Sequence, residues 1–125
     1  MFGIDISEES LRAANDFNRE FIEDGRVVLC LGNVADIKFE DNFFDLAVAV
    51  QNHIYWSRLE AGLSECYRVL KKDRIFLIIY EVDKIDYHLP KYKDTAIFSD
   101  LLYKTGFNSV EIIREGNHIA FISVK

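Results

Sequence analysis

The sequence predicts an α/β fold of the Rossmann-like, doubly wound kind, with a mostly parallel sheet that ends in an antiparallel hairpin. Segments of strand length alternate with segments of helical periodicity. Several strand segments are near-continuous apolar runs, which are typical of buried parallel strands. The last two are separated only by Glu115-Gly116-Asn117, a hairpin turn. At 125 residues the chain is expected to form a single domain, residues 1–125.

The first part of the chain predicts a strand, a helix and a second strand. Phe2 to Ile6 is an apolar strand, and Val27 to Leu31 is the next one. Between them, from Glu8 to Glu23, apolar side chains recur at helical spacing. Ser7 is placed to cap the amino end of this helix, and Gly25 to take the left-handed conformation that closes it. The second strand is apolar throughout, so we expect a sheet covered on both faces.

The middle of the chain predicts two further strands around a helix. Asp45 to Val50 and Ile75 to Tyr80 are apolar runs of strand length. Between them, Ser57-Arg58-Leu59-Glu60 matches a capping box, which predicts that a helix begins there. The polar stretch from Val82 to Asp94 contains the only proline, Pro90, and reads as a loop. Long loops of this kind often serve as lids or binding segments.

The last part predicts a helix and the closing hairpin. Thr95 to Thr105 has apolar side chains on one face, and Gly106 is placed to end the helix. Val110 to Arg114 and Ala120 to Val124 then form the two hairpin strands. A dinucleotide-binding Rossmann domain does not need an antiparallel strand at this edge of its sheet.

Composition excludes several classes of partner. The formal net charge of −6 argues against nucleic-acid binding, because a phosphate backbone favours lysine and arginine clustered on one face. No apolar run approaches the ~20 residues of a membrane-spanning helix, so no membrane partner is expected. The amino end also lacks the basic and apolar pattern of a signal peptide. We therefore expect a cytoplasmic protein.

Cysteine and histidine give no metal motif. Cys30 and Cys66 are far apart and have no partners at metal-ligand spacing, so we interpret both as small buried apolar side chains. The three histidines, at positions 53, 88 and 118, are scattered along the chain.

Four segments in order resemble the class I S-adenosylmethionine-dependent methyltransferases. They are "GIDIS", "VLCLGNVADIKFEDNFFDLAVAV", "YRVLKKDRIFLII" and a helix ending "KTGF" before the hairpin. The resemblance covers essentially the whole chain and is closest to the small-molecule methyltransferase-domain group. In that group "KPGG" usually stands where this chain has "KKDR". The resemblance implies methyl transfer from S-adenosylmethionine to a small-molecule acceptor.

The resemblance also implies residues of the cofactor site. Asp5 matches the acidic residue that accepts hydrogen bonds from the cofactor ribose, and Ile6 would lie against the adenine. Asn33 stands where the family usually has aspartate, and its amide oxygen can accept from the adenine amino group. The backbone N–H of Val34 would meet the ring. Gln51 follows a strand at the sheet edge where such folds place ligands, so it joins this set.

The stretch after Gln51 supplies the catalytic candidates. Methyl transfer is an in-line displacement, so proximity and alignment can supply most of the catalysis and a general base is optional. If one is used, His53 is the candidate, because its unperturbed pKa lies near neutrality. Tyr55 and Trp56 could wall the pocket or face the cation with their rings. The alternative is that this stretch is a loop of packed aromatic side chains that leads into the next helix.

The family's first strand, first helix and Gly-rich loop have no counterpart in this sequence. We therefore expect a truncated domain, whether from a truncated gene, a mis-assigned start or a cloned fragment. In the family's strand order the missing strand lies between those predicted at 2–6 and 45–50. Unpaired amides along such a gap cost ~1–3 kcal/mol each. Either the two strands close up, or two chains pair their edges; we predict a homodimer.

Three functions stay open at this point. The first is a methyltransferase whose cofactor binding is weak or absent unless a partner replaces the missing loop. The second is a non-catalytic methyltransferase-like remnant that acts as a dimerising or interaction module. A nicotinamide-dependent oxidoreductase would also use a carboxylate like Asp5, but the hairpin and the motif spacing argue against it.

Overall fold

The protein is described by a computed structural model that covers residues 1–125. Its strands are β1 (Phe2–Asp5), β2 (Val28–Leu31), β3 (Phe44–Val50), β4 (Leu70–Glu81), β5 (Ser109–Glu115) and β6 (His118–Val124). Its α-helices are α1 (Glu8–Phe17), α2 (Arg19–Glu23), α3 (Leu59–Val69), α4 (Val82–His88) and α5 (Thr95–Thr105). Two 3-10 helices are η1 (His53–Tyr55) and η2 (Pro90–Tyr92). The predicted α/β class is confirmed.

The strands form two separate sheets. β1 and β2 pair in parallel, and the second sheet has the order β3-β4-β6-β5. In it β3 and β4 are parallel, whereas β6 runs antiparallel to both β4 and β5. The predicted closing hairpin is therefore confirmed, with Gly116 in its turn at φ 57°. The long strand β4 includes the "KKDR" segment, where Asp73 has φ 60°.

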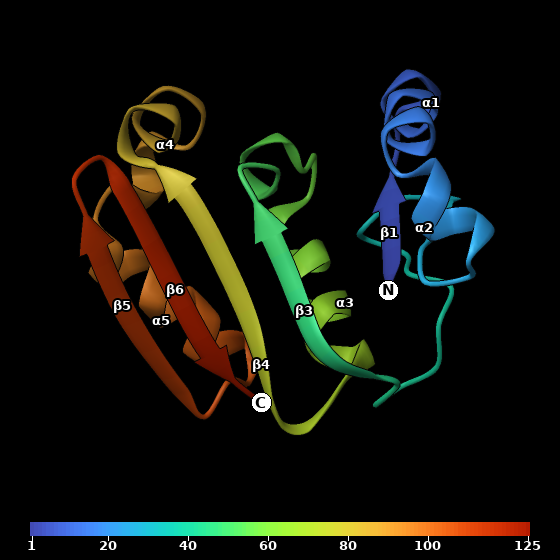
Figure 1. The fold of residues 1–125 in the computed structure, drawn as a ribbon. Coiled ribbons are helices and arrows are strands. Elements are labelled where there is room, and N and C mark those ends of the chain that lie inside the picture. Colours follow the sequence, from blue (N-terminus) through green and yellow to red (C-terminus); the bar gives the residue numbers. More distant parts are fainter.

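No ladder joins β1 to β3. Figure 1 shows β1 (dark blue) and β3 (green) pointing in the same direction on either side of the break between the sheets. A cavity lined by residues of both strands lies between them. The first of the two expected repairs, in which these strands close up against each other, is therefore not the one the chain adopts.

Helices cover only one face of the four-stranded sheet. Phe76, Ile78 and Tyr80 of β4 are buried against α3 and α5, which lie behind the sheet in Figure 1. The side chains that alternate with them point to the opposite face, where no helix lies. On that face Val48 and Val50 are half exposed, at 50% and 54%. β2, whose apolar run predicts a sheet covered on both faces, belongs to the other sheet, where its Val28 and Leu31 are 42% and 58% exposed. The prediction is therefore wrong for both sheets, because an apolar run shows only that a strand can be buried.

The uncovered face is apolar across β3, β4 and β6, and β5 adds Ile113 beside the polar Ser109 and Glu111. The strand registers align Leu46, Ile75 and Val124 in one row, and Val48, Leu77 and Ile122 in the next. A third row adds further apolar side chains from all four strands. We call this grid the bare face; its ten apolar residues are Leu46, Val48, Val50, Ile75, Leu77, Ile79, Ile113, Ala120, Ile122 and Val124.

The first helix is broken where the sequence predicts one continuous helix. Ser7 caps α1 as predicted, with its Oγ accepting from the N–H of Ser10 at 3.1 Å, and Gly25 has the expected φ of 72°. Asn18, however, leaves the helical conformation (φ −103°, ψ 18°) and donates from its side chain to the Ala14 carbonyl. Phe17, the last residue of α1, is 87% exposed.

Two other local predictions are wrong. The capping box is absent, since α3 begins at Leu59 and Arg58 stands before it with no side-chain cap hydrogen bond. The segment expected to be a loop contains α4 and η2 instead. Both are held by buried side chains, Ile85 and Tyr92, that pack into the core. No helix of the structure has the length and apolar character that crossing a membrane requires.

Candidate functional site

Two adjoining cavities lie along β1. One has a volume of about 290 Å³ between β1 and β3, and 14 of its 16 lining residues are hydrophobic; we call it the apolar slot. The other has about 420 Å³, lies at the carboxyl ends of β1 and β2, and is mostly polar; we call it the polar cavity. Four residues from three segments line both cavities: Ile4, Val34, Asn52 and Trp56. The two cavities therefore adjoin each other at the carboxyl end of β1.

Asp5, the last residue of β1, lines the polar cavity. Its Oδ1 accepts from the N–H of Ser7 at 2.8 Å, which fixes the carboxylate at the start of α1. Its Oδ2 accepts no hydrogen bond from the protein and is free to accept from a ligand. Ile6, the next residue, lines the same cavity with its side chain 72% exposed.

The turn after β2 forms the adjoining wall. Asn33 lines the cavity, and its Oδ1 accepts from the N–H of Ala35 at 2.9 Å, so one of its acceptor positions is already used. The N–H of Val34 donates to no group of the protein and is available to a ligand. Gly32 packs so closely under Ile4 that an added Cβ would lie 2.9 Å from the Ile4 Cδ1.

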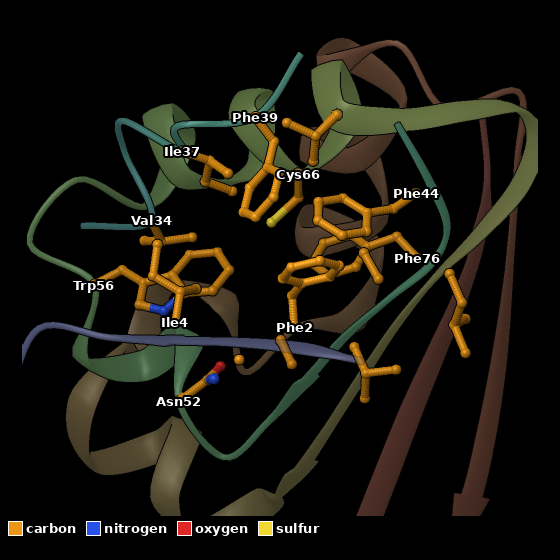
Figure 2. A pocket seen from close by; sticks show the side chains of 16 residues that line it. Phe2, Ile4, Val34, Ile37, Phe39, Phe44, Asn52, Trp56, Cys66 and Phe76 are labelled. Carbon is orange, nitrogen blue, oxygen red and sulfur yellow. The ribbon is translucent and has the colours of Figure 1, made fainter. Parts of the chain in front are cut away.

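Gln51 lies apart from the other four predicted cofactor residues. It has a left-handed backbone, with φ 54°, and its N–H donates to the Ile79 carbonyl at 2.8 Å. It lines neither cavity. The neighbouring Asn52 lines both instead, and Figure 2 shows its amide group near Ile4 at the edge of the slot.

The two predicted catalytic residues differ sharply in surroundings. Tyr55 lines the polar cavity, is 65% exposed, and packs its ring edge-on against His88, with centroids 4.7 Å apart. His53 is fully buried, lines neither cavity, and has Tyr80 and Phe98 rings within 5.7 Å of its own. Neither ring nitrogen has a hydrogen-bond partner. Burial lowers the pKa of His53 to about 4, so the ring is neutral at pH 7. Its role as a general base stays a prediction.

Neither cysteine lies in the polar cavity. Cys66 is buried at the end of the slot below Phe39, where burial raises the pKa of its thiol to about 12. Cys30 is half buried in β2. The prediction of a buried apolar side chain is thus confirmed for Cys66 and only in part for Cys30.

Several residues of the polar cavity are not among those predicted from the sequence. They are Ile4, Ser10, Gly32, Asn52 and Ser57. Gly32 directly follows β2, and Asn52 is the second residue after β3. Side chains at the carboxyl ends of parallel strands meet at one sheet edge. That rule could have identified both. The two serines belong to helix starts, where capping is the ordinary explanation for serine.

The polar cavity is suited to an uncharged, hydroxyl-bearing ligand with a flat ring. A single carboxylate, Asp5, offers an acceptor for hydroxyl groups, and the Val34 N–H offers a donor. Ile6 and Trp56 provide apolar walls. No lysine or arginine lines the cavity, so an anionic ligand group would find no cationic partner there.

Comparisons with known proteins agree with this arrangement. The sequence model of the family described as "Methyltransferase domain" matches residues 1–78. Squalene methyltransferase 1 of Botryococcus braunii is 26% identical over 108 residues, which are 86% of this chain and 29% of that protein. The chain therefore spans less than a third of that relative.

Solved structures share the fold. A protein from Methanococcus maripaludis, provisionally assigned as an S-adenosyl-L-methionine-dependent methyltransferase, superposes with a TM-score of 0.79 at 22% identity. The match covers 99% of this chain and 66% of that one. The [4+2]-cyclase SpnF superposes with a TM-score of 0.69 at 24% identity, covering 90% of this chain and 44% of that one. A cyclase with this fold shows that the fold alone does not determine the reaction.

Proposed function

The chain belongs to the methyltransferase domain family, and from this we propose that it carries the nucleoside-binding part of an S-adenosylmethionine-dependent methyltransferase. One observation carries the proposal. Four of the five residues that the resemblance assigns to the cofactor, Asp5, Ile6, Asn33 and Val34, line a single cavity. Those four come from two segments about thirty positions apart, and the parallel pairing of β1 with β2 brings them together.

The residues present fit the nucleoside half of the cofactor. The free Oδ2 of Asp5 would accept from ribose hydroxyls, and the unpaired N–H of Val34 would donate to the adenine ring. Ile6 would pack on the face of the adenine, and Tyr55 would close the outer side of the cavity. When bound, S-adenosylmethionine supplies a methyl group that its sulfonium already activates for transfer to a small-molecule acceptor.

We further propose that this chain alone binds the cofactor weakly. The cavity offers no cation to the methionyl carboxylate, and charge-assisted hydrogen bonds of that kind contribute ~1.5–3 kcal/mol each. Losing two of them changes an affinity by a factor of order 10²–10⁴. Affinity should then come almost entirely from the nucleoside.

A titration followed by two-dimensional ¹H–¹⁵N NMR tests this function. We expect adenosine and S-adenosylhomocysteine to bind within about threefold of each other, in the millimolar range, and to shift the Val34 amide signal. Asp5→Asn should weaken both at least tenfold, because a charged acceptor becomes a neutral one. Asp16→Asn, which changes an exposed carboxylate on α1 outside the cavity, should leave binding unchanged.

Two results would count against the proposal. A low-micromolar constant for S-adenosylhomocysteine would overturn the weak-binding part. Equal effects of Asp5→Asn and Asp16→Asn would remove the nucleoside site itself.

A second candidate function is a non-catalytic interaction module, and the bare face favours it. With strands ~4.8 Å apart and ~3.3 Å per residue, the grid measures on the order of 300 Å². An uncovered apolar patch of that size is comparable to the largest patch of a typical monomer, about 300–600 Å², and such patches often serve in binding. Two copies that pack these faces would bury far less than the 1,200–2,000 Å² of a stable dimer. We therefore propose a weak homodimer through this face.

A further inference from the structure

Gly62 is the only glycine inside a helix of this protein, and it is buried in α3. Its φ is not positive, and its N–H donates to the Arg58 carbonyl at 3.0 Å, as in an ordinary helix. Alanine forms helices better than glycine does. Since the backbone at this position does not require glycine, the reason for it must lie in the side chains that surround it.

Two side chains occupy the space next to Gly62. A Cβ added to Gly62 would lie 2.6 Å from Cε3 and 3.1 Å from Cζ3 of Trp56, and 3.1 Å from Cγ1 of Val34. Carbon atoms in favourable contact are ~3.5–4.0 Å apart. The indole ring is rigid, so it cannot bend out of the way and would have to move as a whole.

Trp56 and Val34 separate Gly62 from the polar cavity. Both line that cavity, whereas no residue of α3 does, and Figure 2 shows the Trp56 ring beside Val34. The backbone of Trp56 is held in place, because its N–H donates to the His53 carbonyl at 3.2 Å. A side chain at position 62 would therefore displace the indole ring away from α3 and toward the cavity.

We propose that Gly62 is a positioning residue of the polar cavity. Its missing side chain lets Trp56 and Val34 pack directly against α3, which sets the width of the cavity and the place of the Val34 N–H. Gly62 lines neither cavity, so it acts only through these two neighbours. The consequence for ligand affinity rests on the proposed nucleoside-binding function, whereas the position of the two side chains can be measured without a ligand.

Fluorescence and NMR of the free protein test the position. Trp56 is the only tryptophan, so the emission reports on this ring alone. In Gly62→Ala the rate constant for acrylamide quenching should rise by at least half, because the ring leaves its place against α3. The Val34 amide signal should shift in the ¹H–¹⁵N spectrum.

Ser64→Ala is the matched control. It places alanine at an exposed position of the same helix, where the Ser64 hydroxyl donates to the Glu60 carbonyl. It should change neither the quenching of Trp56 nor the Val34 signal. Circular dichroism should show that α3 is retained in both variants, since alanine favours the helix.

An adenosine titration tests the consequence for binding. Gly62→Ala should weaken adenosine at least fivefold, because the displaced ring narrows the cavity. Trp56→Leu removes both ring atoms that the added Cβ would meet. In the Trp56→Leu background, Gly62→Ala should therefore change the affinity less than twofold. A role of Gly62 in helix stability alone would act equally in both backgrounds, because side chains that do not interact have additive effects.

The possible failures are distinct. If Gly62→Ala leaves Trp56 quenching and the Val34 signal unchanged, Gly62 does not position the wall. If it weakens adenosine equally in both backgrounds, the effect does not act through Trp56, and the inference is overturned. If the native protein binds no adenosine, the proposed function fails, and the quenching comparison without ligand still decides whether Gly62 positions Trp56.

Discussion

The buried imidazole of His53 makes the stability of the protein depend on pH. Its pKa is about 4 in the folded protein, because burial disfavours the charged ring, and about 6.5 in the unfolded chain. The unfolded state therefore binds a proton between these values and the folded state does not. The stabilisation is fully present above pH 6.5 and is lost as the pH falls toward 4.

Denaturant unfolding of His53→Leu would measure this contribution. We expect the free energy of unfolding of the native protein to fall by about 2 kcal/mol from pH 7.5 to pH 5 through His53 alone. His53→Leu should lack this part of the decrease. His118→Gln, which changes a histidine with a largely exposed side chain, should retain it. An unchanged pH dependence in His53→Leu would contradict the assignment.

Some residues of the candidate site could be predicted from the sequence, and others could not. Asp5, Ile6, Asn33 and Val34 lie at or just after the carboxyl ends of two predicted strands. Because the carboxyl ends of parallel strands share one edge of the sheet, the sequence pattern is sufficient to bring them together. Gln51 and His53 also follow a strand, but the positive φ of Gln51 redirects the chain. Sequence alone does not show that turn, and so does not show that His53 points into the core.

Two helices end at glycines with positive φ, and the space around these glycines differs in how well it would accept a side chain. Gly106 ends α5 at φ 125°, and an added Cβ would lie 2.9 Å from the Tyr67 ring. Gly25 closes α2 at φ 72° with nothing within 4 Å of such a Cβ. Both conformations are unfavourable for alanine, but only the first adds a steric clash.

Comparing two alanine variants separates these effects. Gly25→Ala should lower the free energy of unfolding by about 1 kcal/mol, and Gly106→Ala by at least about 2 kcal/mol. Thermal or denaturant unfolding would measure both. Equal losses would mean that Tyr67 moves aside without cost.

The elements themselves were predictable where local signals were sufficient. The hairpin, the glycine helix ends and the parallel strands all follow from turn chemistry and apolar runs. The break at Asn18 and the helix α4 were not predictable in this way. The side chain of Asn18 donates a hydrogen bond to the Ala14 carbonyl at the point where the helix breaks. Helix α4 is stabilised by the burial of Ile85 in the core. Neither effect leaves a clear periodic signal.

At the scale of the molecule, the bare face should make the isolated chain self-associate. Sedimentation velocity should show a monomer–dimer equilibrium with a dissociation constant in the range of tens to hundreds of micromolar. Val48→Lys should shift it to monomer, because a cation in the middle row of the apolar grid would be buried by the partner's apolar face. Lys71→Ala, which removes an exposed cation from β4 away from the grid, should leave it unchanged. A monomer at all concentrations would contradict the proposal.

The absence of a ladder across the slot has a mechanical consequence. No hydrogen bond or ion pair joins residues 1–32 to residues 44–125. The two parts cohere through dispersion contacts, such as those of the Phe2 ring with Phe44, and through the connecting segment 33–43. Dispersion contacts impose no hydrogen-bond register, so they fix the relative orientation of the two parts less tightly than a strand ladder would. Residues 1–32 should therefore change their angle to the rest of the protein more easily than a strand of a continuous sheet would. Because both parts line the polar cavity, this angle sets the width of the cavity.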